Sequence, residues 1–156
     1  ISACLVGSEM CIRDRPYIME SYRNGFTCGA FDLLHPGHVH FIHEARKRCD
    51  FLIVGLHTDP TIDRPESKNK PIQSVFERYL QLDGLSCVDL IVPYDTERDL
   101  VNMMATLDIQ VRFVGSDYDG KKITGEDICD QRGIEVSYIP RLHDFSSTSL
   151  RERLRS

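Results

Sequence analysis

No apolar segment of this 156-residue chain is long enough to cross a membrane, and it has no low-complexity tract or internal repeat. We therefore predict one globular domain with its own hydrophobic core and no stable membrane insertion. The six cysteines form no Cys-x-x-Cys pair and fall mostly in apolar segments, which predicts buried, reduced thiols in a cytoplasmic protein. A net charge of −5 disfavours nucleic acid as a partner, whereas a small anionic ligand remains compatible because local donors matter more than total charge.

Residues 1–15 have no periodicity that relates them to the rest of the chain. They also lack the long apolar core of a secretory signal. We predict that residues 1–15 are a non-native or disordered N-terminal segment and that residues 24–155 form the domain.

From residue 24 onward, short apolar runs alternate with segments of helical periodicity. Strands are predicted at 25–30, 51–56, 90–93, 111–115 and 136–139, and helices at 37–49, 74–82, 97–107, 124–132 and 147–155. The runs lack strict polar–apolar alternation, as expected of parallel strands that are covered on both faces. The pattern predicts an α/β fold, a Rossmann-like, doubly wound, five-stranded parallel sheet, which binds ligands at the carboxyl ends of its strands.

The motif His35-Pro36-Gly37-His38 lies where the first predicted strand passes into the first helix. Pro36 suits the first helical position, where a missing N–H costs nothing, and Gly37 lets a ligand approach the backbone. Free N–H groups and the helix dipole attract anions at such a junction, and two imidazoles add further donors. The motif therefore predicts a site for nucleotide phosphates.

Histidines three residues apart could instead bind zinc or belong to the core. On the predicted helix His38 shares a buried stripe with Ile42, Ala45 and Cys49, whereas His40 and His43 are predicted to be solvated. No further zinc ligands converge on the face of His38. We therefore prefer the phosphate site.

Polar residues also follow other predicted strands. Asp59 follows the second strand, Gly115-Ser116-Asp117 the fourth, and Arg141 the fifth. Ser146 or Ser147 can cap the last, basic helix, and such a cap serves either as a second anion pocket or simply as a good helix start.

Two further cations are candidates for the same chemistry. Lys68, in the charged loop 63–71, could neutralise phosphate charge in a transition state, or it is an ordinary surface lysine. Arg78 follows on the next helix, where the alternative is a simple helix salt bridge.

These motifs resemble a known family. Residues 29–38 are similar to the signature of the cytidylyltransferases within the HIGH-type nucleotidyltransferase superfamily. Residues 54–59, with Lys68 ahead of Glu77-Arg78-Tyr79, resemble phosphoethanolamine and phosphocholine cytidylyltransferases. Residues 115–121 and the closing segment 141–148 are more similar to glycerol-3-phosphate cytidylyltransferase. The resemblance covers residues 25–153.

The resemblance implies direct attack of a substrate phosphate on the α-phosphorus of a nucleoside triphosphate, with Mg²⁺ arriving on the triphosphate and no metal held by protein ligands. It also implies a homodimer. The implied catalytic residues are His35, His38, Lys68 and Arg141; the implied nucleotide-binding residues are Gly29, Ala30, Phe31, Gly37, Gly115, Asp117, Ser146, Ser147 and Thr148; and the implied acceptor-binding residues are Asp32, Asp59 and Arg78.

The resemblance favours a cytidylyltransferase that uses CTP and a phosphorylated alcohol, such as glycerol-3-phosphate or phosphoethanolamine, to make a CDP-alcohol for a lipid or cell-envelope precursor. The sequence departs from the pattern of the cytidylyltransferases at two places. Ala30 stands where many bacterial members have threonine, and Ser146-Ser147-Thr148-x-x-Arg151 resembles a motif of adenylyltransferases. The alternatives are an ATP-dependent adenylyltransferase acting on a flavin or sugar phosphate, and a catalytically silent nucleotide-binding module. Retention of both motif histidines and Lys68 disfavours the silent module.

Overall fold

A single sheet of five parallel strands, in the order β3-β2-β1-β4-β5, organises the computed structural model, which describes residues 22–156. The strands are β1 (Asn24–Gly29), β2 (Phe51–His57), β3 (Leu90–Tyr94), β4 (Val111–Gly115) and β5 (Glu135–Ile139). The helices are α2 (Pro36–Arg46), α3 (Val75–Asp83), α4 (Glu97–Thr106), α5 (Glu126–Arg132) and α6 (Ser147–Arg155), with a short 3₁₀ turn, η1 (Ser116–Tyr118). The predicted α/β class and doubly wound parallel sheet are confirmed, whereas the segment 1–15 lies outside the described residues.

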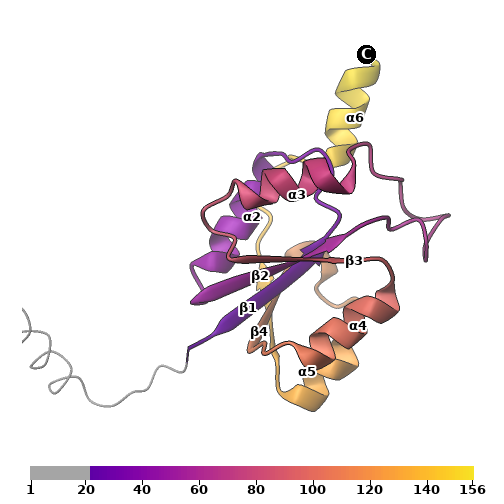
Figure 1. The fold of residues 1–156 in the computed structure, drawn as a ribbon. Helices are drawn as coiled ribbons and strands as arrows, with labels where there is room; N and C mark the ends of the chain where they lie inside the picture. The colour runs from indigo at the N-terminus through magenta and orange to yellow at the C-terminus, as the bar shows by residue number, and fades with distance from the viewer. Residues whose placement is uncertain (1–21) are drawn as a thin grey trace, which may run out of the picture.

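Helices cover both faces of the sheet (Figure 1). Ile42 of α2 and Leu82 of α3 belong to the apolar core on one face. Leu100 and Met104 of α4 pack with Cys129 of α5 in the core on the other face. α6 projects away from these layers, and none of its residues is buried. Within residues 22–156, every helix is too short or too polar to cross a bilayer.

The strand order places a switch point between β1 and β4, since the chain winds outward to β3 on one side and to β5 on the other. Backbone pairing between these two strands covers the register Gly25↔Val111 and Phe26↔Arg112. Beyond it the Thr27 hydroxyl donates to the Phe113 carbonyl at 3.2 Å. Open α/β sheets bind ligands outside the carboxyl ends of the strands at such a point.

Two helix boundaries differ from the prediction by two residues or more. α2 ends at Arg46 rather than Cys49, because the chain must turn there to enter β2. α5 begins at Glu126 rather than at residue 124, because Gly125 has φ +82°, a left-handed conformation that a right-handed helix excludes. An added Cβ at Gly125 would also lie 2.8 Å from the Met104 sulfur.

The four cysteines among the described residues are free thiols. Cys129 is buried, and Cys28, Cys49 and Cys87 are half-buried, which is less complete burial than predicted. Burial raises the pKa of the Cys28 thiol above its ordinary value, so this side chain stays protonated at neutral pH.

Candidate functional site

The start of α2 is capped by a histidine side chain. His35 is the N-cap residue, and its Nδ1 accepts a hydrogen bond from the Gly37 N–H at 3.1 Å. The N–H groups of His38 and Val39 donate to the His35 carbonyl, and Pro36 has no N–H. The prediction of free amide donors at this helix start is therefore wrong, because His35 satisfies them. Since Nδ1 accepts, the proton of the neutral His35 ring lies on Nε2.

The two motif histidines form a stacked pair. Their ring centroids lie 3.8 Å apart with an interplanar angle of 24°, and Phe31 meets the His38 ring edge-on at 5.4 Å. Nδ1 of His38 is buried and has no hydrogen-bond partner among residues 22–156. A buried, unsatisfied nitrogen is costly, so this atom marks a place where a ligand can supply the missing partner.

Both imidazoles are neutral near pH 7. Burial, reinforced by the nearby His35 ring, lowers the pKa of His38 to about 4. Burial also lowers the pKa of His35, and the proximity of His143 and Arg141 lowers it further. The pair therefore offers neutral N–H donors in the free protein.

This neutrality predicts acid sensitivity of the fold. The unfolded chain binds a proton at His38 below pH 6.5, and the folded chain does so only below about pH 4, so stability falls as pH drops through this window. We expect His38 alone to lower the free energy of unfolding by about 1 kcal/mol between pH 7 and pH 5.5. Urea unfolding of wild type, His38→Asn and the exposed control His43→Asn at the two pH values measures it. If the free energy of unfolding changes between pH 7 and pH 5.5 by the same amount in His38→Asn as in wild type, the assignment to His38 is wrong.

A third histidine, not among the predicted site residues, completes the cluster. A Cβ at Gly37 would lie 2.6 Å from Cε1 of His143 and 2.8 Å from Cε1 of His35, so glycine is needed here for both rings to pack on the helix start. Nδ1 of His143 is also buried without a partner in the described part of the chain. His143 contacts His40 edge-on at 5.8 Å, so His40 is half-buried rather than solvated as predicted. The sequence signal for His143 was its place in the closing segment 141–148.

The loop between β1 and α2 is strained. Phe31 has φ +50° and Leu33 has φ +51°, a left-handed region that bulky residues rarely adopt. The Leu33 N–H donates to Gln73 Oε1 at 2.8 Å. Between Phe31 and Leu33, the Asp32 carboxylate accepts hydrogen bonds from the N–H groups of Ile72 and Gln73, and these bonds hold the loop. Such strain persists where surrounding contacts over-determine the backbone, and it concentrates at functional sites.

Asp32, a predicted acceptor-binding residue, is buried and occupied by contacts within the chain. Its two oxygens accept from the N–H groups of Ile72 and Gln73, each at 2.9 Å, and Arg151 donates to Oδ2 at 2.7 Å. Burial alone would raise the pKa of Asp32, but these donors outweigh it and hold the pKa below its ordinary value. The structure therefore places Asp32 as a brace that joins the β1–α2 loop to α6.

Arg78, also predicted to bind the acceptor, is 1% exposed and clamps backbone carbonyls. Its guanidinium donates to the carbonyls of Gln73, Ala30, His57 and Thr58 at 3.2, 2.8, 2.7 and 2.6 Å. An arginine side chain has five N–H donors in all. A single donor is left for a ligand, and the helix salt bridge considered as the alternative is absent from the described contacts of Arg78.

The Asp59 carboxylate accepts hydrogen bonds from within the chain, whereas the Lys68 ammonium has no such partner among the described residues. The Asp59 carboxylate accepts from the hydroxyl and N–H of Thr61 at 2.6 and 2.9 Å, and these bonds lower its pKa. Lys68 is half-buried, and its ammonium has no hydrogen-bond or ion-pair partner among the described residues. Two residues further on, the Lys70 carbonyl accepts from Arg151 at 3.3 Å, which ties this loop to α6.

Arg141 is paired with another predicted site residue. It donates to Asp117 Oδ2 at 2.8 Å and to the Phe145 carbonyl at 3.0 Å, and its own N–H donates to the Ser116 hydroxyl. These bonds hold the closing segment against η1, beyond β4. A Cβ at Gly115 would meet no atom within 4 Å, so the space beside this glycine is open.

The start of α6 lies against the β1–α2 loop. Ser146 is the N-cap residue and accepts from the Ser149 N–H at 3.0 Å, as predicted. Ser147 donates to the Asp32 carbonyl at 2.9 Å, whereas Thr148 is exposed. The structure thus brings both predicted phosphate segments to one edge of the sheet.

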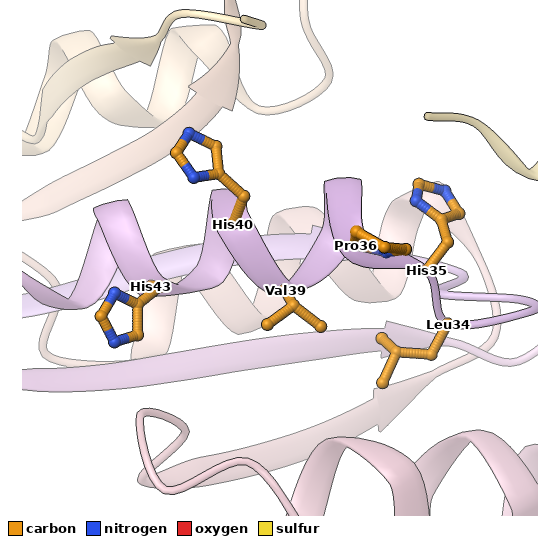
Figure 2. Close-up of a pocket in the computed structure, with 6 residues that line it drawn as sticks. All are labelled: Leu34, His35, Pro36, Val39, His40 and His43. Atoms are coloured by element: carbon orange, nitrogen blue, oxygen red, sulfur yellow. The ribbon is translucent and has the colours of Figure 1, made fainter. Parts of the chain in front are cut away.

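A shallow hollow of about 610 Å³ lies along the outer side of α2. Its lining residues are Leu34, His35, Pro36, Val39, His40 and His43 (Figure 2). In this view His35 and His40 project from one side of the helix, and Leu34 and Val39 project from the other. His35 and Pro36 of the helix start line this hollow, whereas His38 does not.

Comparison with known proteins decides the family. A family model described as cytidylyltransferase-like matches residues 26–153. The chain belongs to the cytidylyltransferase-like family. This agrees with the resemblance found in the motifs, and Gly29, Ala30 and Phe31 lie within the matched segment.

Several proteins named bifunctional protein HldE are similar to this chain. That of Rhodopseudomonas palustris (strain HaA2) is 37% identical over 153 residues, 97% of this chain and 31% of the relative. That of Hyphomonas neptunium is 39% identical over 126 residues, 81% of this chain and 26% of the relative. The chain therefore spans less than a third of the length of these relatives.

Solved structures agree with the fold. A lipopolysaccharide core biosynthesis protein from Thermoplasma volcanium is 25% identical, with a TM-score of 0.61, over 80% of this chain and 98% of that one. Pantothenate synthetase from Thermus thermophilus shares the fold, at 15% identity and a TM-score of 0.59, over 82% of this chain and 61% of that one. Family and relatives together make this chain a nucleotidyltransferase domain.

Proposed function

We propose that this domain transfers the adenylyl group of ATP to a sugar phosphate and releases pyrophosphate. The observation that carries the reaction type is the stacked, neutral pair His35 and His38 at the start of α2. The pair lies beside the switch point of the sheet, where ligands of such folds bind. Nε2–H of His35 and the unpartnered Nδ1 of His38 are the groups that a triphosphate would engage.

In this proposal a phosphate oxygen of the acceptor attacks the α-phosphorus of ATP. A new P–O bond forms, the bond between the α-phosphorus and its bridging oxygen breaks, and pyrophosphate leaves with the electron pair. The chain contributes positioning and charge stabilisation and forms no covalent intermediate. His35 donates to the phosphates, and the unpaired ammonium of Lys68 approaches the α-phosphate and the incoming acceptor.

The choice of ATP rests on the relatives and on one motif. The comparisons support the adenylyltransferase alternative better than the CTP-dependent reaction that the sequence favoured, because the HldE proteins match over nearly the whole chain. The Ser146-Ser147-Thr148-x-x-Arg151 pattern is consistent with this. The Thermoplasma protein named for lipopolysaccharide core synthesis supports a sugar phosphate as the acceptor.

Mg²⁺ enters this proposal with the nucleotide. Asp32 and Asp117, two carboxylates among the residues predicted to bind the acceptor or the nucleotide, are both engaged by arginines of the chain. Oxygens of the triphosphate are therefore the expected ligands of the ion. The homodimer implied by the resemblance stays a prediction.

The test is pyrophosphate release with Mg²⁺ and either ATP or CTP, each with hexose 1-phosphates, heptose 1-phosphates, glycerol-3-phosphate or phosphoethanolamine. We expect release with ATP and a sugar phosphate, and a product mass equal to the acceptor plus an adenylyl group. Release with CTP and an alcohol phosphate would contradict this proposal and show that the domain is a cytidylyltransferase. Nucleotide binding without release from any pair would favour the silent binding module.

A further inference from the structure

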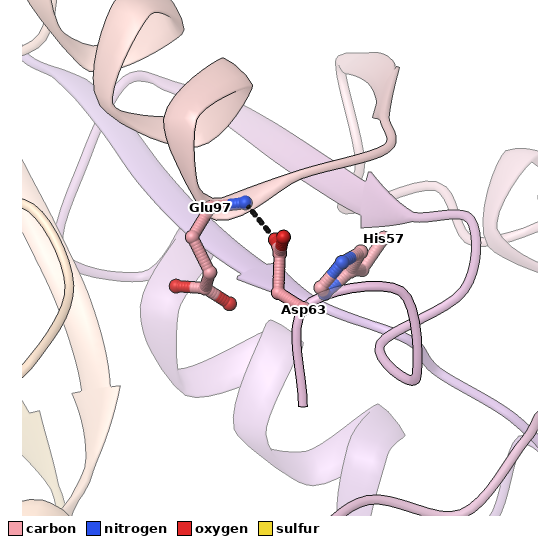
Figure 3. Close-up of side chains that lie close together, drawn as sticks. All are labelled: His57, Asp63 and Glu97. Atoms are coloured by element: carbon pink, nitrogen blue, oxygen red, sulfur yellow. Dashed lines mark hydrogen bonds between the residues drawn. The ribbon is translucent and has the colours of Figure 1, made fainter. Parts of the chain in front are cut away.

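A second cluster of ligand-type side chains lies outside the phosphate site. It consists of His57, Asp63 and Glu97 (Figure 3). A ring nitrogen of His57 and a carboxylate oxygen from each acid lie within 4.8 Å of one another. His57 ends β2, Asp63 belongs to the following loop, and Glu97 begins α4. Pairing of β2 with β3 through the register His57↔Tyr94 brings these distant segments together.

The His57 ring is held in one orientation. It is 2% exposed and stacks on Tyr94 with centroids 4.5 Å apart. Its Nε2 lies 3.1 Å from the Asp95 carbonyl, which only accepts hydrogen bonds, so Nε2 carries a proton and donates. In the neutral ring Nδ1 then keeps a free lone pair, and this atom has no hydrogen-bond partner among residues 22–156. A metal-binding histidine characteristically donates its other N–H to a backbone carbonyl in this way.

Each acid keeps oxygen atoms available for a cation. Asp63 accepts the Glu97 N–H through Oδ2 at 2.5 Å, and Glu97 accepts from Arg64 through Oε1 at 2.6 Å (Figure 3 draws the first of these bonds). The second oxygen of each carboxylate has no protein donor in the described contacts. Asp63 is exposed and Glu97 half-buried, so their side chains have room to rotate.

We propose that His57, Asp63 and Glu97 form a site for a divalent transition-metal cation such as Zn²⁺. One imidazole and two carboxylates suit Zn²⁺ or Mn²⁺, whereas Mg²⁺ and Ca²⁺ prefer oxygen ligands throughout. Ligands at about 2.1 Å from a tetrahedral ion lie about 3.4 Å apart. The carboxylates therefore move inward by about 1 Å on binding, a side-chain rotation.

The consequence of binding concerns the loop between β2 and α3. The cation ties Asp63, in this loop, to the rigid end of β2 and the start of α4. Lys68 lies five residues beyond Asp63 in the same loop. Zinc therefore limits the motion of the segment that carries Lys68. This inference uses none of the contacts on which the proposed function rests.

The test is calorimetric titration of the whole, chelator-treated chain with ZnCl₂ and, separately, with MgCl₂. The variants are Asp63→Asn and Glu97→Gln, and the matched control is Glu66→Gln, an exposed acid in the same loop. We expect one equivalent of zinc to bind wild type and the control, and binding at least about ten-fold weaker in both variants. Thermal unfolding without metal verifies that each variant folds.

Tryptic cleavage between Lys68 and Asn69 gives an independent readout of the loop. Zinc should slow this cleavage in wild type and in Glu66→Gln but leave it unchanged in Asp63→Asn. Absence of zinc binding overturns the proposal. Zinc binding that both variants retain also overturns it, because the ion is then held elsewhere, for example near His40 and His143. Equal binding of Mg²⁺ overturns it as well, because the cluster is then an ordinary acidic surface.

Discussion

Replacement of His38 by alanine is expected to lower the turnover of the nucleotidyl transfer by about a thousandfold and to leave the fold intact. The reason is that His38 faces the helix start with a buried nitrogen that the described chain does not satisfy, and its ring stacks on His35. Loss of this ring removes one phosphate partner and the surface that orients the second imidazole. Steady-state pyrophosphate release with the best nucleotide and acceptor pair measures the effect.

The matched control is His43→Ala. His43 lies on the same helix, is exposed, and borders the outer hollow rather than the stacked pair. Its turnover should equal that of wild type. If both variants keep wild-type turnover and unfold normally, the catalytic role assigned to His38 is wrong.

Replacement of Arg78 by methionine is expected to destabilise the fold by about 4 kcal/mol, because four carbonyls of the site loops lose their donor in a buried position. Methionine keeps much of the side-chain length but offers no N–H. For a domain of this size the loss corresponds to a midpoint of thermal unfolding lower by about 12 °C. Calorimetry and urea unfolding measure it.

The control for this variant is Arg98→Met, which removes an exposed arginine on α4 and should change stability by less than about 0.5 kcal/mol. The same experiment separates two roles of Arg78. Normal stability with a higher KM for the acceptor would show that Arg78 binds substrate, as the resemblance implied. Lower stability with little change in KM at low temperature would show that it holds the strand ends in place.

The architecture could be predicted from the sequence. Parallel strands covered on both faces require continuous apolar runs, and helices that cover them require apolar stripes, so both patterns are visible in local residue order. Pro36 and Ser146 mark helix starts for equally local reasons, and the structure has α2 and α6 begin there. The motif 35–38 likewise predicts an anion site from local residue order, and this site stays a prediction.

The roles of single site residues needed the tertiary structure. Whether the acid Asp32 and the base Arg78 meet a ligand or the backbone depends on residues 40 or more positions away, such as Ile72 and Ala30. The occupied amides of α2 depend on a rotamer of His35, and His143 reaches Gly37 across more than 100 positions.

Local residue order was thus enough to predict the element types, the starts of α2 and α6 and the family of the domain, because propensity and motif spacing act between neighbours. Which donors remain free for a phosphate, and which three side chains meet at the end of β2, followed only from the folded chain. Hydrogen bonds and ion pairs depend on distances of a few ångströms between groups far apart in the sequence, and those distances exist only after the sheet has formed.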